Sequence, residues 1–206
     1  SLIKRTEKNV GEIVLGATVD ATSIGNFDHF IVATGSRQSI PEIKGLRDQY
    51  SITSLEFFEE SKPVRGKRIL IIGAGMVGIE AAEILAGGDY EVVITKRTSE
   101  IANDMEMITK KLMLKRLEQK NNLVISPNTT LMEFTATGVT YQKEDKTGEW
   151  PAFDTVIIAA GMEPENDLYR QLQDQQKSVQ LVGDADNPAD IYAATQKGYL
   201  AATDLV

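Results

Sequence analysis

Residues 67–85 read Lys-Arg-Ile-Leu-Ile-Ile-Gly-Ala-Gly-Met-Val-Gly-Ile-Glu-Ala-Ala-Glu-Ile-Leu. Residues 67–72 end in a short apolar run rich in β-branched side chains, and apolar residues recur at helical spacing from Val77 onward. Gly87-Gly88 would end this helix, and residues 90–95, Tyr-Glu-Val-Val-Ile-Thr, have strand composition again. Strand, helix and strand within about 30 residues predict a βαβ unit, whose right-handed crossover makes the two strands parallel.

Residues 73–78 form a G-x-G-x-x-G motif at the junction of the predicted strand and helix. Gly73 permits a tight turn, Gly75 lets the backbone approach a diphosphate, and Gly78 lets helix and strand pack closely. The free N–H groups and the positive dipole end at the start of the helix favour an anion. We therefore expect a dinucleotide to bind here. The expected contacts are Gly73, Gly75, Met76, Val77 and Gly78.

The end of the second strand, about 20 residues past the glycines, carries an acidic residue in proteins that bind NAD through the ribose 2′-hydroxyl. Here these positions are Thr95, Lys96 and Arg97. Two cations and the hydroxyls of Thr95 and Thr98 suit a 2′-phosphate, so the sequence favours NADP(H) over NAD(H). The alternative is that Lys96 and Arg97 only solvate an exposed loop.

Glu80 follows the last glycine of the motif by two residues, so we expect it in the first turn of the helix. A carboxylate at this place is favoured by the helix dipole whether or not a ligand binds. Glu80 is therefore a candidate site residue with an equally good structural explanation.

The composition excludes several classes of function. With 22 basic and 30 acidic residues, the formal net charge of −8 argues against nucleic-acid and membrane-surface partners. The sequence contains no cysteine, which excludes disulfides, thiol nucleophiles and thiolate-bound metals within it. His29 is the single histidine, so we expect it to be structural, with no metal site or histidine-based relay. We assign no catalytic residue. Because the sequence has no long apolar run, we expect a cytoplasmic protein.

The segment after the βαβ unit predicts a surface helix and a small β-meander. Residues 103–120 have helical periodicity, and the strands that follow are expected at 123–125, 129–134 and 139–142, with a polar turn at 145–148. Residues 153–159 would return as a central strand. The apolar stripe of the helix would consist of Met105, Ile108, Leu112 and Leu117.

Two segments on either side of the nucleotide unit resemble each other. Residues 27–35, Phe-Asp-His-Phe-Ile-Val-Ala-Thr-Gly, share five of nine identities with residues 153–161, Phe-Asp-Thr-Val-Ile-Ile-Ala-Ala-Gly. This repeat indicates a duplicated type of domain, although apolar strands that end in glycine also arise by chance. Near the carboxyl terminus, residues 179–185 alternate like a strand and contain Gly183-Asp184, and helical spacing follows at 191–200. An aspartate at such a place can bind a flavin's ribityl chain or cap the helix.

Taken in order, these motifs resemble the pyridine-nucleotide/flavin oxidoreductase superfamily over nearly the whole chain. Residues 75–82 and 100–105 resemble the C-terminal half of the NADH:flavin oxidoreductase, 2,4-dienoyl-CoA reductase and trimethylamine dehydrogenase family. The resemblance implies that NAD(P)H binds at the glycine motif with Glu80 towards the nicotinamide, and that hydride passes to FAD. The further cofactor-binding residues that it implies are Thr34, Gly35, Ala160, Gly161, Gly183 and Asp184.

The resemblance also implies a domain organisation. The fold class is α/β, with a Rossmann-like NAD(P)-binding domain and its β-meander at 40–165, between partial FAD-binding segments at 1–39 and 166–206. In such relatives a barrel with FMN, a 4Fe-4S cluster and the flavin domain's own glycine motif precede this region. This N-terminal catalytic domain of the same chain would be the FMN/iron–sulfur or enoate-reducing partner that receives electrons from FAD. We expect residues 1–206 alone to bind FAD weakly and to be inactive.

Two other functions fit the same residues. One is a fragment of a disulfide reductase of the same superfamily, whose redox cysteines would lie upstream. The other is a non-catalytic structural or regulatory module that binds ADP, as in the trimethylamine dehydrogenase branch. Binding of a nicotinamide dinucleotide in preference to ADP would discriminate against this last function.

Overall fold

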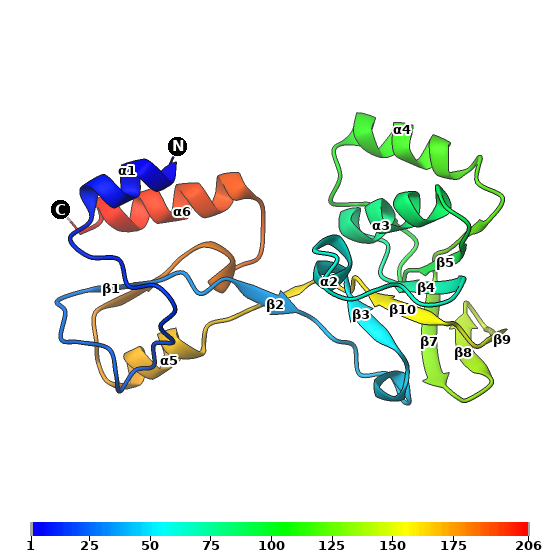
Figure 1. Cartoon of the computed structure of the whole chain (residues 1–206), viewed down its shortest axis with the longest axis horizontal. Coiled ribbons are helices and arrows are strands. Elements are labelled where there is room, and N and C mark those ends of the chain that lie inside the picture. The colour runs from blue at the N-terminus through cyan, green and yellow to red at the C-terminus, as the bar shows by residue number, and fades with distance from the viewer. Residues whose placement is uncertain (1, 206) are drawn as a thin grey trace. The chain divides into compact units, whose positions relative to one another are not determined.

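Figure 1 shows a computed structural model of the chain, in which residues 2–205 are described. The chain forms two compact units: the central unit, residues 36–163, and the flanking unit, whose described residues are 2–35 and 164–205. Two short strands, β2 (Ser36–Gln38) and β11 (Met162–Pro164), pair with each other where the chain passes between the units. No helix among residues 2–205 is long and apolar enough to span a lipid bilayer.

A five-stranded parallel sheet forms the middle of the central unit, with the strands in the order β3-β10-β4-β5-β6. The strands are β3 (Ser51–Thr53), β4 (Arg68–Ile72), β5 (Glu91–Thr95), β6 (Leu123–Ser126) and β10 (Thr155–Ile158). Since all neighbours are parallel, their carboxyl ends share one edge, here called the carboxyl edge, where open α/β sheets bind ligands. The predicted βαβ unit and the α/β, Rossmann-like fold class are confirmed.

The two faces of this sheet are covered differently (Figure 1). On one face, Ile69 and Ile71 of β4 pack in a buried cluster with residues of α3 (Met76–Ala86) and α4 (Met107–Leu117). On the other face, Leu70 and Ile72 pack with η1 (Leu46–Asp48) and with an antiparallel sheet. This alternation along β4 follows from the two-residue period of a strand, and it makes the unit a three-layered structure. A short helix, α2 (Ser54–Phe58), follows β3 directly.

The β-meander is composed differently from the prediction. Residues 123–126 form the edge strand β6 of the parallel sheet, and the antiparallel sheet consists of β7 (Thr129–Phe134), β8 (Gly138–Lys143) and β9 (Lys146–Pro151). The chain turns at Glu144 and Asp145, and Glu144 has a left-handed backbone with φ 54°. Residues 146–148, which we expected in the turn, pair with β8. Trp150 stacks on Tyr141 across these strands at a centroid distance of 4.0 Å.

Helix α4 is shorter than the predicted helix, and of the predicted stripe it buries only Leu117. The buried side chains are Met113 and Leu117, while Ile108 and Leu112 are 69% and 55% exposed. The physical reason is the turn at residues 101–105, which breaks the helical period before Glu106 caps α4. Met105 therefore does not continue the helical stripe.

The flanking unit contains a two-stranded parallel sheet of β1 (Phe30–Val32) and β12 (Val179–Leu181). Its helices are α1 (Leu2–Asn9), α5 (Asp167–Asp174) and α6 (Ile191–Thr203), with a 3-10 turn η2 (Gly183–Ala185). Phe30, Val32 and Leu172 form its small core with Ala21. The predicted strand at 179–185 ends earlier than expected, so Gly183 and Asp184 lie in η2 rather than in the strand.

The two repeated segments have the same local structure. Each forms a parallel strand, β1 or β10, and each then reaches a glycine in the left-handed region, Gly35 with φ 78° and Gly161 with φ 104°. The strands that follow these glycines are β2 and β11.

Candidate nucleotide-binding site

The glycine motif forms the turn between β4 and α3 at the carboxyl edge. Gly73 has φ 111°, a conformation that residues with a Cβ rarely adopt, and its N–H donates to the carbonyl of Thr95 at 3.0 Å. A Cβ at Gly73 would lie under 3.0 Å from the carbonyl oxygen of Ala159. Both the backbone conformation and the space therefore require glycine here.

The last glycine of the motif allows helix α3 to approach the turn. A Cβ at Gly78 would lie under 3.0 Å from the carbonyl oxygen of Gly73 and 3.4 Å from the Cβ of Ala159. This contact fixes the start of α3 against the end of β4, as a diphosphate-binding turn requires.

The amino end of α3 already holds one carboxylate. Gly75 precedes the helix with an ordinary extended backbone, and the N–H of Met76 donates to Oδ1 of Asp104 at 2.8 Å. A Cβ at Gly75 would lie 3.1 Å from Oδ2 of Asp104. The side chains of Met76 and Val77 are partly exposed at this end. Asp104 is absent from the predicted site residues.

Lys96 and Arg97 follow β5 at the same edge. The backbone of Lys96 is fixed by its N–H to Ser126 at 3.1 Å and by its carbonyl, which accepts the N–H of Thr129 at 2.8 Å. Lys96 is half-buried and Arg97 exposed, and among residues 2–205 neither side chain has an ion-pair partner. A fixed backbone with two unpaired cations suits an anionic group.

Two predicted residues differ from expectation in their surroundings. Thr95 is 3% exposed and its hydroxyl donates to the carbonyl of Ile71 at 3.3 Å, so this hydroxyl stabilises the sheet and is not presented to a ligand. Glu80 is the fifth residue of α3, because the helix begins at Met76, and it is half-buried. Its carboxylate therefore lies beyond the first turn, where the dipole effect is smaller.

Ala160 and Gly161 follow β10, and Gly161 is held in part by a side chain that sequence reasoning missed. The carbonyl of Gly161 accepts the N–H of Ser39 at 2.9 Å and Nε2 of Gln38 at 2.7 Å. The Oε1 of Gln38 in turn accepts the hydroxyl of the buried Ser54 at 2.7 Å. No local pattern marks Gln38, because its role depends on β2 lying beside β11.

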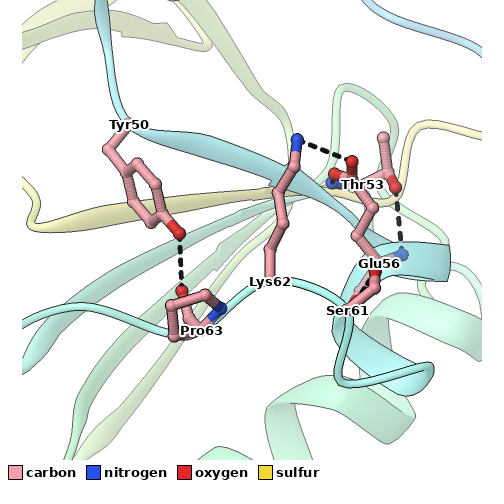
Figure 2. A network of polar contacts seen from close by, with 6 residues as sticks. All are labelled: Tyr50, Thr53, Glu56, Ser61, Lys62 and Pro63. Carbon is pink, nitrogen blue, oxygen red and sulfur yellow. Dashed lines mark hydrogen bonds and ion pairs between the residues drawn. The ribbon is translucent and has the colours of Figure 1, made fainter.

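Helix α2, which begins at Ser54, is capped by a polar network (Figure 2). Thr53 Oγ1 accepts the N–H of Glu56 at 3.1 Å, and Oε2 of Glu56 accepts the N–H of Thr53 at 2.8 Å. Lys62 pairs with Oε1 of Glu56 at 2.6 Å. This ammonium, and to a smaller extent the N–H of Thr53, holds the pKa of Glu56 below its usual range. The network fixes α2 where the chain leaves β3 at the carboxyl edge, in contact with α3.

The flanking unit has its own hollow of about 430 Å³, lined in part by Gly35, Gly183 and Asp184. Asp184 Oδ1 accepts the N–H of Ala189 at 3.2 Å, whereas the cap of α6 is Asp190, which accepts the N–H of Ala193 at 2.7 Å. Asp190 also lines the hollow, and an aspartate directly before a helical pattern could have identified it. The predicted Thr34 does not line it, and its hydroxyl donates to the carbonyl of Glu165.

Comparison with known proteins gives consistent results. A family model described as pyridine nucleotide-disulphide oxidoreductase matches residues 3–195. Bilirubin reductase of Mediterraneibacter gnavus (strain CC55_001C) is 30% identical over 197 residues, which cover 94% of this chain and 30% of that protein. NADH oxidase of Thermoanaerobacter brockii is 31% identical over 203 residues, which cover 93% of this chain and 30% of that protein.

A solved structure supports the fold. Histamine dehydrogenase from Rhizobium sp. 4-9 superposes with a TM-score of 0.73 at 21% identity, over 87% of this chain and 31% of that one. The chain thus spans about 30% of the length of the two curated relatives. Because the family model matches most of its residues, the chain belongs to the pyridine nucleotide-disulphide oxidoreductase family.

Proposed function

We propose that the central unit binds NADP(H), and NAD(H) less tightly, for a flavin-dependent oxidoreductase. In the intact protein the bound nicotinamide would supply hydride to FAD. The observation that carries this proposal is the close approach of Gly78 to Gly73, which a Cβ on Gly78 would prevent. Such an approach exposes helix N–H groups to a diphosphate, and it lies at the carboxyl edge of a parallel sheet.

The residues present fit a dinucleotide. The glycines at 73 and 78 let the start of α3 pack closely on the turn, and the first N–H groups of α3 have no partners within the helix. Met76 and Val77 present these groups, and Ala160 and Gly161 follow the neighbouring strand β10 at the same edge. We propose these residues as the contacts of the diphosphate and nicotinamide parts, with Glu80 towards the nicotinamide.

We propose Lys96 and Arg97 as the residues that bind the 2′-phosphate. They follow β5, the strand next to β4, where the adenosine ribose of a dinucleotide lies in Rossmann-like folds. Neither has a carboxylate partner among the described residues, so their charge is available to an anion. Thr95 supports them only through its backbone and its place in the sheet.

We propose that the flanking unit is part of an FAD-binding domain. Strand β10 of the central unit is the counterpart of β1 in the repeat. It pairs on one side with β3 and on the other with β4, the strand that leads into the glycine motif. Within the described residues β1 pairs only with β12, so its second edge is free for a strand of the same kind. The hollow lined by Gly35, Gly183 and Asp184 would contribute to flavin binding. Thr34, which directly precedes Gly35, would support it.

A pair of aspartates supports this assignment. Asp154, which precedes β10, accepts the N–H groups of Lys67 and Arg68 at the start of β4, at 2.8 and 2.9 Å. Its equivalent in the repeat is Asp28, which is exposed. A strand that paired with the free edge of β1 would place its first N–H groups near Asp28.

The finer assignment that we propose is to the NADH:flavin oxidoreductase, 2,4-dienoyl-CoA reductase and trimethylamine dehydrogenase branch. The relatives that this chain matches over more than nine-tenths of its length include proteins named bilirubin reductase and NADH oxidase. In this proposal, an N-terminal partner domain of the intact protein holds FMN and a 4Fe-4S cluster and receives the electrons. Residues 1–206 alone would be inactive.

Calorimetric titration of the 206-residue chain with NADPH, NADH and ADP, at one ionic strength, tests the proposal. We expect NADPH to bind more tightly than NADH, and both to bind more tightly than ADP. If ADP bound as well as NADPH, the nicotinamide half would contribute nothing, and the ADP-binding module would be the better function. Failure of all three ligands to bind would contradict the proposal.

A further inference from the structure

A carboxylate occupies the place where the proposed ligand would put its diphosphate. Oδ1 of Asp104 accepts the N–H of Met76 at 2.8 Å, and Oδ2 lies 3.1 Å from the position of a Cβ on Gly75. For that Cβ position, all three nearest atoms within 4 Å belong to Asp104. The space that glycine leaves open above the turn is therefore filled by this side chain.

The backbone around Asp104 is attached to the glycine motif. The N–H of Ala102 donates to the carbonyl of Ala74 at 2.7 Å, and the N–H of Met105 donates back to Ala102 at 3.3 Å. Ala102 is fully buried and has φ 48°, which is uncommon for a residue other than glycine. These contacts hold the turn at residues 102–105 over the motif and place the Asp104 carboxylate at the start of α3.

The Asp104 side chain can rotate away from the start of α3. Asp104 is exposed, and among residues 2–205 its hydrogen-bond donor is the Met76 N–H alone. Rotation of the side chain towards solvent would break this one hydrogen bond and would leave the turn at Ala102 unchanged. A carboxylate and a diphosphate cannot share one N–H donor without strong repulsion, so the ligand must displace Asp104.

We propose that Asp104 is an internal competitor for the diphosphate of the dinucleotide. This inference rests on the proposed function and names the residue that controls access to the same site. A small singly charged anion that replaces the carboxylate makes only the same contact with the Met76 N–H, so it gains little binding free energy. A dinucleotide adds contacts at Lys96, Arg97 and the nicotinamide end, and so displaces Asp104. The residue therefore lowers the affinity for every diphosphate ligand and selects those with further contacts.

The variants Asp104→Ala and Asp104→Asn test this role in the 206-residue chain. Asp104→Ala removes the competitor, and we expect calorimetry to show NADPH and inorganic pyrophosphate binding about tenfold more tightly. Asp104→Asn keeps an oxygen acceptor without the charge, and we expect a gain of about threefold, because neutral hydrogen bonds are roughly half as strong. 2′-AMP has no diphosphate, and its affinity should not change.

A matched control removes the same charge elsewhere in the central unit. Asp145→Asn lies in the exposed turn between β8 and β9, and we expect it to leave all affinities unchanged. An equal gain for Asp145→Asn would show a general charge effect and overturn the proposal. A second readout is the backbone amide signal of Met76 in the NMR spectrum of the free chain, which Asp104→Ala should shift and which should then exchange faster with solvent.

The outcomes separate the two proposals. If NADPH binds the native chain and Asp104→Ala equally, the nucleotide site stands and the competitor role is overturned. If only the variants bind measurably, both proposals stand, and the competition is stronger than expected. If neither the native chain nor any variant binds a diphosphate ligand, the proposed function fails and Asp104 has no ligand to exclude. An unchanged Met76 amide in Asp104→Ala would also overturn the competitor role.

Discussion

A Cβ on Gly78 would lie less than 3.0 Å from the carbonyl oxygen of Gly73, closer than Cβ atoms approach their neighbours in proteins. The carbonyl cannot retreat easily, because Gly73 is itself packed against the carbonyl of Ala159. We expect Gly78→Ala to push α3 away from β4 and to destabilise the central unit by about 1–3 kcal/mol, the usual cost of overpacking. Urea denaturation followed by the fluorescence of Trp150, the single tryptophan, measures this loss.

The control for this variant is Gly198→Ala in the middle of α6, where a Cβ would meet no atom within 4 Å beyond the helix itself. Alanine is favoured over glycine in helices. The urea midpoint measured by Trp150 fluorescence should therefore be no lower than in the native chain. NADPH affinity should fall in Gly78→Ala and not in Gly198→Ala. A Gly78→Ala chain with native stability and affinity would show that the close approach has no role.

Replacing both Lys96 and Arg97 by alanine should weaken NADPH binding more than NADH binding. The two side chains have no ion-pair partners among the described residues, so their charge contributes to ligand binding and little to stability. Charge-assisted contacts to a phosphate are strong, and we expect a loss of about tenfold or more for NADPH. Competition calorimetry with both dinucleotides measures the ratio.

The matching control is the double variant Lys110→Ala and Lys111→Ala on α4, which removes the same charge from the central unit. It should change the two affinities equally and slightly, because these charges are exposed or nearly so and are screened by salt. Equal losses of NADPH and NADH in the Lys96 and Arg97 variant would mean that these residues solvate a loop.

We expect the hydrogen bonds of Asp154 to make the stability of the central unit depend on pH. The backbone N–H groups of Arg68 and then Lys67 hold the pKa of Asp154 below its ordinary range. The folded pKa is lower than the unfolded one, so the stabilisation is fully present above about pH 4 and is lost as the pH falls through the folded pKa. Asp154→Asn should therefore be less stable at pH 7, by about 1 kcal/mol given its exposure.

Urea denaturation at pH 7 and at pH 3 provides the check. The difference between the native chain and Asp154→Asn should shrink at the lower pH, because the native carboxyl becomes protonated. A difference that stays constant with pH would show that the ionised form of Asp154 has no special role.

The glycine motif was predictable because its signal is local: a buried strand, three spaced glycines and a helix occupy one continuous segment. Asp104 was not predictable from spacing, since its contact with Met76 depends on the turn at Ala102, which has φ 48° in a residue other than glycine. Strand β9 was missed because residues 145–148 have turn composition. The pairing with β8 and the stacking of Trp150 on Tyr141 override that local preference.

Short polar elements were also beyond sequence reasoning. Helix α5 has eight residues and one fully buried side chain, Leu172, so its apolar pattern is too short to identify a helix. Gln38, which accepts the Ser54 hydroxyl, reaches Gly161 only because β2 pairs with β11, a relationship between segments more than 120 residues apart. Local composition identifies the glycine turn between β4 and α3, and tertiary contacts determine which side chains surround it.

The capping box of α2 yields the last prediction. Thr53→Ala removes the side-chain oxygen that accepts the Glu56 N–H, and we expect a loss of about 1 kcal/mol in the stability of this helix. Glu56→Gln keeps an acceptor for the Thr53 N–H and loses only the pair with Lys62, whose side chain is 50% exposed, so its cost should be smaller. Amide hydrogen exchange at residues 54–58 measures both effects locally. In Thr53→Ser, which retains the hydroxyl, these amides should exchange as in the native chain. If they exchanged as fast as in Thr53→Ala, the hydroxyl would not be what holds α2 in place beside the proposed nucleotide site.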